Sequence, residues 1–416
     1  MIKIFTITLI MFFTLFPINF VFLPSFASTR LTLAFLGSVI WFLDLVRKRK
    51  IYYYKFLTVF FITFLISIWS VLSAFVLSSG NDYTFVKLPI TIAVMYFSSY
   101  LCISTINVFY SEVNFNVVTK YFIYAILLQS LIVVIQFVNP EIASLISQIQ
   151  RLTERQVNIS TSQLEDGSRF IGFGLLFYTA SFFYGTALIL IAFQLKYKSM
   201  TQVSKISGLL IYLVIFFIGM GLARSTIIGF ASSLIVFIFP IKSVKSIINI
   251  TFKFIISIIL TILTIFIIIK IFPTFTKSLE ALINNAFDFV IAYINTGKLS
   301  SESASGTIDY FVFPNDIRTY LVGTGLYETY FSKGDYNYSD VGYLRLLYYF
   351  GIPGMILFLI VEAKLLKLAF KTKKLKPIYY SMLIILFITN IKGLTTLAVI
   401  AMLYALIPNK KMDSYK

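Results

Sequence analysis

Long apolar runs, separated by polar connections, recur along the whole chain. A run of about 20 residues is long enough for a helix to cross the hydrocarbon core of a bilayer. The runs are continuous and do not alternate between apolar and polar residues, which excludes a transmembrane β-barrel. The pattern therefore predicts an all-α, polytopic integral membrane protein with about 12 transmembrane helices.

Twelve spans are predicted, at about residues 4–24, 31–46, 55–78, 88–107, 117–138, 170–194, 206–223, 226–241, 248–272, 341–360, 377–391 and 394–408. The first should stay uncleaved, because its apolar core is too long for a signal peptide. Residues 1–272 then hold transmembrane helices 1–9, and residues 273–340 form a long external loop. Residues 341–416 hold helices 10–12 and a cytoplasmic tail.

The charged residues give these spans a direction. Only 12% of the residues are charged, with a net charge of +18, whereas about a quarter are charged in a soluble domain. The basic loop "RKRKIYYYK", residues 47–55, should be cytoplasmic by the positive-inside rule. Alternation then places both termini and the whole net charge inside, together with four acids: Asp44, Glu112, Glu362 and Asp413. The basic charge therefore requires no nucleic-acid partner.

Arginine is concentrated on the predicted outer side, where seven of the nine arginines fall: Arg30, Arg151, Arg155, Arg169, Arg224, Arg318 and Arg345. A planar guanidinium can bind phosphate or carboxylate through two hydrogen bonds, which an ammonium group cannot match. Arg151, Arg155 and Arg318 are expected to pair with outer acids. The candidates for binding an anionic substrate are Arg169, Arg224 and Arg345.

Two of these candidates have unusual surroundings. Arg169 opens the sixth span in "SRFIGFG", where an interfacial arginine could equally extend its side chain toward water. Arg224 lies in "GMGLARSTIIGF", between two short apolar runs, and needs a charged partner because an arginine inside a membrane costs about 2.5–3.5 kcal/mol. Weaker polar candidates are Gln129 and Gln136, on one face of the fifth span, and Lys392 at the end of the eleventh.

The external loop has a pattern of its own. Apolar residues from Leu279 to Ile294 follow a helical period, which predicts an amphipathic helix on the outer membrane surface or over the bundle. A tyrosine-rich stretch follows, with Glu328 and Asp335 as weaker acidic candidates. Aromatic and acidic side chains together suit carbohydrate, but tyrosine is equally typical of the membrane interface, so both interpretations stay open.

Asp340 stands where this loop meets the tenth span, in "SDVGYLRLLYYFGIPG". One helical stripe continues from it through Leu344, Leu347, Gly351 and Gly354. Pro353 permits a kink in the same helix. Asp340 could cap the helix or work at the mouth of an outward cavity, and the two roles are compatible.

Histidine is absent, and the one cysteine, Cys102, lies in an apolar run. The chain can therefore form no internal disulfide and has no His/Cys cluster for a metal. Transfer chemistry would have to depend on carboxylate, arginine, lysine, tyrosine or serine side chains. Neither a metal nor a cofactor is expected.

The order of several short motifs resembles one family. "SRFIGF", then "ARST", then "VGTGL" in the external loop and "DVGYLRLLYYFGIPG" after it resemble the O-antigen polymerase and ligase superfamily. Within that superfamily the chain is most similar to Wzy-type polymerases of O-antigen, capsule or exopolysaccharide. Related ligases carry a histidine at the position of Asp340, so the absence of histidine favours a polymerase.

This resemblance implies a C-type glycosyltransferase architecture in the bacterial cytoplasmic (inner) membrane. It implies a metal-independent enzyme that polymerises oligosaccharide repeat units linked to undecaprenyl pyrophosphate at the outer leaflet. Arg169 and Arg224 match family arginines that hold pyrophosphate, and Asp340 is the first candidate to orient or deprotonate the acceptor hydroxyl. Alternatives are a ligase-like transferase, a flippase or transporter of lipid-linked sugar, and a non-catalytic assembly subunit. Whether a chain-length regulator binds stays open.

Overall fold

The computed structural model describes residues 1–24, 27–48, 54–76, 82–110, 112–151, 169–174, 177–197, 202–238, 276–296, 311, 313–326 and 341–408. Within these residues the regular structure is helical, apart from two isolated β-bridges. Eight of the described helices are long and apolar enough to cross a membrane. The chain is therefore an all-helical, polytopic membrane protein, as its apolar runs predict.

The eight long helices are α2 (Thr29–Lys48), α3 (Tyr54–Val76), α4 (Leu88–Phe109), α5 (Phe115–Val138), α8 (Phe177–Tyr197), α9 (Gln202–Leu222), α16 (Gly342–Ala369) and α17 (Lys376–Lys392). Two apolar helices are shorter, α1 (Ile2–Leu15) and α10 (Thr226–Ile238). The other described elements are α6 (Pro140–Ile149), α12 (Thr276–Ala286), α13 (Asp288–Thr296), α15 (Ile317–Leu321), the 3-10 turn η3 (Lys373–Leu375) and α18 (Ala398–Ala405). The predicted span 248–272 lies outside the described residues.

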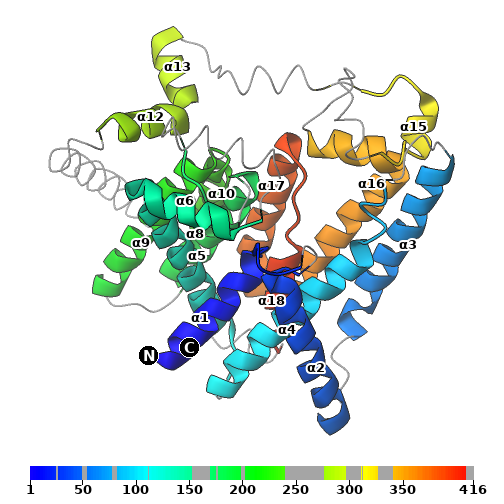
Figure 1. The fold of residues 1–416 in the computed structure, drawn as a ribbon, viewed down its shortest axis with the longest axis horizontal. Helices are drawn as coiled ribbons and strands as arrows, with labels where there is room; N and C mark the ends of the chain where they lie inside the picture. The colour runs from blue at the N-terminus through cyan, green and yellow to red at the C-terminus, as the bar shows by residue number, and fades with distance from the viewer. Residues whose placement is uncertain are drawn as a thin grey trace.

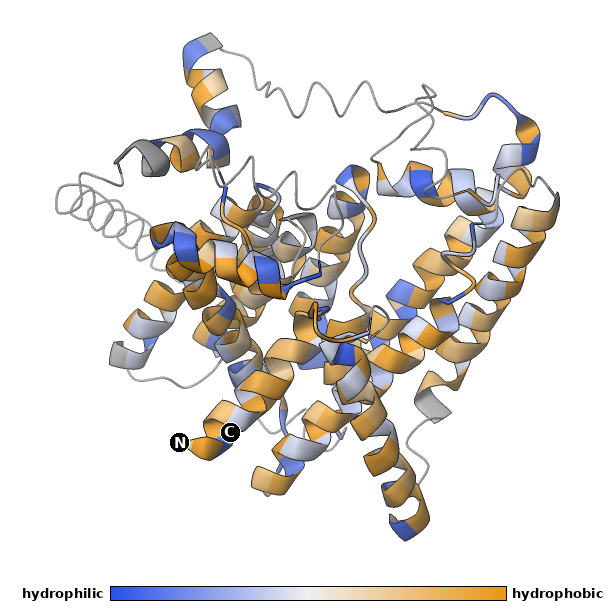
Figure 2. Cartoon of the chain, in the orientation of Figure 1, coloured by the Kyte–Doolittle hydropathy of each residue, from blue (hydrophilic) through white to orange (hydrophobic). Residues whose placement is uncertain are grey.

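The helices pack in two groups, which lie at the left and right of Figure 1. One group is α5, α8, α9 and α10, and the other is α2, α3, α4 and α16. Between them lie α1, α17 and α18, which contact both groups. Apolar residues dominate the long helices, whereas polar residues are frequent on α12 and α13 at the upper end of the view (Figure 2).

The first span is shorter than the sequence predicts. Helix α1 ends at Leu15, and residues 16–24 form an irregular link to α2. The Arg30 side chain donates from Nε to the carbonyl of Thr14 (2.7 Å) and from Nη2 to that of Leu15 (2.9 Å). The last carbonyls of a helix have no partner within it, so this guanidinium from α2 stabilises the early end of α1.

The tenth span is broken near the Pro353 position at which the sequence permits a kink. Helix α16 leaves helical geometry at Gly351 (φ 68°, ψ −175°), two residues before Pro353. The break ends the predicted stripe, because Leu344 and Leu347 are buried before it and Gly354 belongs to the second half. A kink is therefore present, but glycine at positive φ makes it.

The "VGTGL" segment forms hydrogen bonds with the backbone of α16 next to this break. The N–H of Thr324 donates to the carbonyl of Tyr348 (2.6 Å), and the N–H of Gly325 donates to that of Tyr349 (3.1 Å). Gly323 has φ 82°, and a Cβ there would overlap the carbonyl oxygen of Tyr349. Two motifs that lie far apart in the sequence thus form one interlocked joint, in which backbone contact requires the glycine.

The last span is helical over only part of its predicted length. Helix α18 covers Ala398–Ala405, and residues 394–397 before it are not helical. Glu362, which the sequence assigns to the inner side, is buried within α16 with 2% of its surface exposed. It accepts hydrogen bonds from the Thr396 hydroxyl and from the N–H of Leu397 (3.0 Å). The carboxylate thus supplies acceptors that the start of α18 needs.

We expect Gly323→Ala to lower the free energy of unfolding by about 3 kcal/mol or more. The reason is strain at positive φ together with overlap against backbone. The melting temperature of the purified protein in detergent measures the effect. Gly208→Ala in α9 is the matched control, because the new Cβ would meet only the side-chain tip of Leu195, at 2.9 Å. Equal melting temperatures for the two variants would contradict the interlocked joint.

The predicted topology, with both termini inside, can be tested at two exposed asparagines. Asn284 lies in α12 at the upper end of Figure 1, and Asn107 lies near the end of α4 at the lower end. On a Cys102→Ser background, we expect Asn284→Cys to react with a membrane-impermeant thiol reagent added outside the cell. Asn107→Cys should react only after the membrane is opened. The reverse labelling pattern would overturn the topology.

Candidate functional site

Arg224 lies at a tight turn between two helices. Helix α9 ends at Leu222 and α10 begins at Thr226, so the connection is short, as predicted. The Thr226 hydroxyl donates to the carbonyl of Gly219 (2.8 Å) and closes the turn. A Cβ at Gly219 would come within 3.0 Å of the Tyr184 ring, so glycine lets the turn pack against α8.

Close packing against α8 also fixes the direction of α10. Gly185 and Gly229 face each other, and a Cβ on Gly185 would lie 3.0 Å from the Cα of Gly229. Small residues permit such an approach between membrane helices. The turn that carries Arg224 is therefore supported by three helices in mutual contact, α8, α9 and α10.

Arg169 lies in an irregular loop, although the sequence predicts a helix from residue 170. Helix α8 begins only at Phe177, and residues 169–174 are not helical. Gly174 has φ 70°, a conformation that interrupts a helix. The predicted start of the sixth span is therefore wrong by several residues, and Arg169 belongs to the loop that precedes it.

Side-chain amides from α5 hold this loop in place. Gln129 Nε2 donates to the carbonyl of Phe173 (3.2 Å), and Gln136 Nε2 donates to that of Ile171 (3.3 Å). Both glutamines are buried, with 0% and 3% of their surfaces exposed. A buried carbonyl needs such a donor when no helix supplies one. The two glutamines predicted as weak site candidates thus position the loop that carries Arg169.

The loop is also tied directly to the end of α9. The N–H of Phe170 donates to the carbonyl of Gly221 (3.0 Å). A Cβ at Gly221 would lie 2.5 Å from the Phe170 ring, so a larger residue would push the loop away. At its other end, the N–H of Gly174 donates to Gln150 Oε1 (3.0 Å). These contacts bring two of the three candidate arginines to one site.

The two guanidinium groups at this site act on each other. Burial and the positive charge of Arg224 lower the pKa of Arg169 from its usual value. Among the described residues Arg169 forms no ion pair, whereas Arg224 pairs with Asp288. The two guanidinium groups thus place two positive charges near each other. The pair therefore suits an anion with more than one negative charge.

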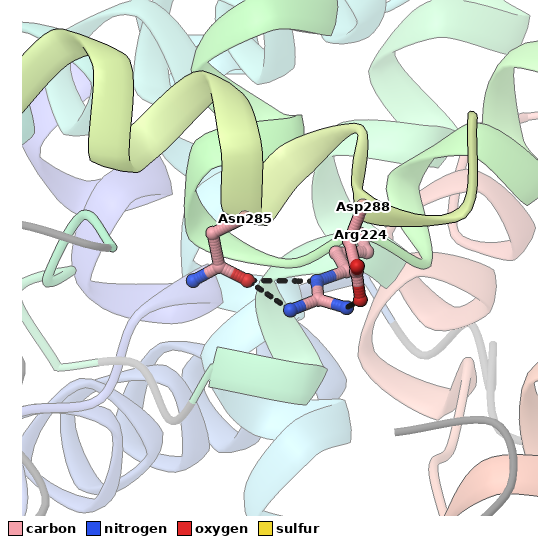
Figure 3. A network of polar contacts seen from close by, with 3 residues as sticks. All are labelled: Arg224, Asn285 and Asp288. Atoms are coloured by element: carbon pink, nitrogen blue, oxygen red, sulfur yellow. Dashed lines mark hydrogen bonds and ion pairs between the residues drawn. The ribbon is translucent and has the colours of Figure 1, made fainter. Parts of the chain in front are cut away.

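Helices α12 and α13 supply partners of Arg224. The predicted amphipathic helix is present, but it breaks at Phe287 between α12 and α13. Asp288 Oδ2 lies 2.7 Å from Arg224 Nη1, and Asn285 Oδ1 accepts from Nε (2.8 Å) and from Nη2 (Figure 3). The expected charged partner of Arg224 is thus present. Sequence reasoning missed both partners, whose only signal is a polar face on the amphipathic helix.

Of the remaining predicted site residues, the structure describes two, Arg345 and Lys392. Asp340, Glu328 and Asp335 fall outside the described residues, so their roles stay predictions. Arg345 is in α16, whose main neighbours in the described part of the chain are α3, α15, α17 and α18. Lys392 is exposed in the last turn of α17.

Arg151, which the sequence predicts on the outer side, has a structural role. The sequence predicts that it pairs with an acid, but its Nη2 donates to the carbonyl oxygens of Val21 and Leu23, both at 3.0 Å. Arg155 lies outside the described residues, and Arg318 is exposed in α15. The guanidinium of Arg151 therefore stabilises the link between α1 and α2, and the prediction for this residue is wrong.

We expect Gln136→Leu to loosen the Arg169 loop while the protein still inserts. The carbonyl of Ile171 would lose its donor, and an unsatisfied buried carbonyl costs about 1–3 kcal/mol. Hydrogen–deuterium exchange at residues 169–174 should become faster. Gln148→Leu is the matched control, because Gln148 is exposed in α6. Unchanged exchange in the Gln136 variant would remove this residue from the positioning of the loop.

Comparisons with known proteins add no template for this site. No protein-family model matches the chain, and neither curated proteins nor solved structures give a match. In the part of the chain that the structure describes, no group of three or more His, Cys, Asp or Glu residues could hold a metal ion. The arginine pair is therefore interpreted from its own geometry and charge.

Proposed function

We propose that this chain polymerises lipid-linked oligosaccharide repeat units, as a metal-independent glycosyltransferase at the outer leaflet of the bacterial cytoplasmic membrane. The observation that carries the proposal is the approach of the Arg169 loop to the Arg224 turn, where the N–H of Phe170 donates to the carbonyl of Gly221 (3.0 Å). The positive charge of the two arginines suits the diphosphate of undecaprenyl-pyrophosphate-linked saccharide. A guanidinium binds such a group better than an ammonium does, which explains arginine at both positions.

The proposed reaction transfers the growing saccharide from its lipid to an incoming repeat unit. The bond between the anomeric carbon and the diphosphate oxygen breaks, and the lipid diphosphate leaves with the electron pair. A hydroxyl oxygen of the incoming unit forms the new glycosidic bond, and its proton passes to a base. Arg169 and Arg224 would stabilise the charge that develops on the departing diphosphate, which is often the largest contribution to catalysis.

Asp340 is our candidate for the base that orients or deprotonates the acceptor hydroxyl. Helix α16 begins at Gly342 with Val341 in the N-cap position, so Asp340 comes one residue before the cap. This position in the chain favours a role beyond capping. Glu328 and Asp335 are the next candidates, from the same loop.

The proposal includes a wider architecture. It takes the chain as a C-type glycosyltransferase with 12 spans, both termini in the cytoplasm and the loop before α16 outside. The product would be O-antigen, capsule or exopolysaccharide, and a chain-length regulator is a candidate partner. In support, the short motifs of the resemblance fall at structural joints of the fold: "SRFIGF" at the Arg169 loop, "ARST" at the Arg224 turn, and "VGTGL" at the break in α16.

A deletion strain tests this proposal against a flippase and a ligase. We expect single repeat units on undecaprenyl pyrophosphate to accumulate, to be reachable from outside the cell, and to remain unpolymerised. Units confined to the inner leaflet would indicate a flippase instead. Polymer of normal length that stays on the lipid carrier would indicate a ligase.

A further inference from the structure

The guanidinium of Arg224 is already occupied by protein groups. Its Nη1 pairs with Asp288 at 2.7 Å, while Nε and Nη2 both contact the amide oxygen of Asn285 (Figure 3). Carboxylate and phosphate oxygens use the same N–H groups of an arginine. A diphosphate that binds Arg224 through these groups must therefore displace them.

The two helices that carry these groups differ in how far their described residues are buried. In α12, Leu282 and Ala286 are buried, with 8% and 4% of their surfaces exposed, and the helix contacts α9. In α13, by contrast, Tyr293 and Ile294 are 53% and 74% exposed. Asp288 opens α13, directly after the break at Phe287. The carboxylate thus stands at the hinge between an attached helix and a projecting one (Figure 1).

The ion pair is accessible enough to exchange. The side chains of Arg224 and Asp288 are 21% and 33% exposed, respectively. Ion pairs in contact with solvent contribute little net stability, because water replaces much of the lost interaction. The nearby Arg169 adds a second positive charge to the site. A ligand with two or more negative charges can therefore outcompete a single carboxylate.

We propose that Asp288, supported by Asn285, is an internal counter-ion of the anion site. It occupies Arg224 in the empty enzyme and is displaced when the diphosphate of the lipid-linked substrate binds. This inference rests on the proposed function. It assigns α12 and α13 to the entrance of the site. It also explains how the positive charge of Arg224 is offset before substrate binds.

Binding of inorganic pyrophosphate to the purified full-length protein in lipid nanodiscs tests the exchange at low ionic strength. Asp288→Asn keeps the size of the side chain and removes the competing charge, so pyrophosphate should bind about fivefold more tightly, which corresponds to about 1 kcal/mol. Glu280→Gln is the matched control, because it removes one acid from an exposed position on the same helix pair. Its affinity should change less than twofold.

Unchanged or weaker binding in Asp288→Asn would overturn the inference and make Asp288 a residue that orients Arg224 for substrate. Equal tightening in Glu280→Gln would overturn it too, because the effect would then be general electrostatics. The wild-type protein gives a second measurement: pyrophosphate should speed hydrogen–deuterium exchange in residues 276–296, and unchanged or slower exchange would contradict displacement. Arg224→Gln tests the proposed function separately. Undiminished pyrophosphate binding in that variant would show that Arg224 does not form an anion site.

Discussion

Arg224→Lys is expected to reduce polymer formation at least about 100-fold, although it keeps the positive charge. Arginine presents a planar set of donors, and three of its nitrogens are used at once by Asn285 and Asp288. An ammonium group cannot reproduce that geometry on a carboxylate or a diphosphate. Removing one preorganised donor to a developing negative charge typically costs 10²–10³-fold in rate, as an order of magnitude. Polymer length and yield, with membrane expression checked, measure the loss.

Arg318→Lys is the matched control for this prediction. Arg318 is exposed in α15, and the same change there should leave polymer unaltered. Wild-type polymer from a normally expressed Arg224→Lys strain would show that the arginine serves only as a topological charge. Loss of polymer in both variants would show that the effect of the substitution is not specific to Arg224.

Asp340→Asn is expected to abolish polymer while the protein still inserts into the membrane. A general base typically contributes about 10²–10⁴-fold to the rate, so the defect should appear as missing polymer and not as slightly shorter polymer. If Asp340 only capped α16, asparagine and serine would replace it well, because both cap about as well as aspartate. If the carboxylate acts as the base, single repeat units should accumulate on the lipid carrier in the asparagine variant.

A parallel Asp340→Ser variant separates the two roles of Asp340. Both variants should fail if the carboxylate is needed, and both should be tolerated if it serves as a cap. Long polymer from a well-expressed Asp340→Asn strain would exclude Asp340 from the mechanism. The same two replacements at Asp335, together with Glu328→Gln, would then locate the base.

The membrane class, most helix positions and the Arg224 turn could be predicted from the sequence, because length and polarity determine them locally. Charge at "ARST" between two apolar runs also predicted that Arg224 needs a partner, which Asp288 provides. The identity of that partner could not be predicted. It depends on how the loop helix folds back onto α9, and this long-range packing has no local signature beyond a polar helix face.

The breaks within spans also depend on long-range contacts, which local sequence does not reveal. Hydropathy predicted helices through residues 16–24, 170–174 and 394–397, because their composition is apolar. In each place a distant polar side chain stabilises the non-helical backbone. Arg151 does so after α1, Gln136 does so before α8, and Glu362 does so before α18. Such side chains look like ordinary membrane or surface residues until their partners are known.

Reconstitution of the purified chain tests the proposed polymerase activity most directly. Repeat units on undecaprenyl pyrophosphate would be isolated from the deletion strain. They would be added to lipid vesicles that contain the wild-type protein, in the presence of a metal chelator. We expect longer lipid-linked saccharides, with one undecaprenyl pyrophosphate released for each glycosidic bond formed, and neither product with Arg224→Gln. Intact single units after prolonged incubation with wild-type protein, or their movement across the bilayer without release of undecaprenyl pyrophosphate, would contradict the proposed function.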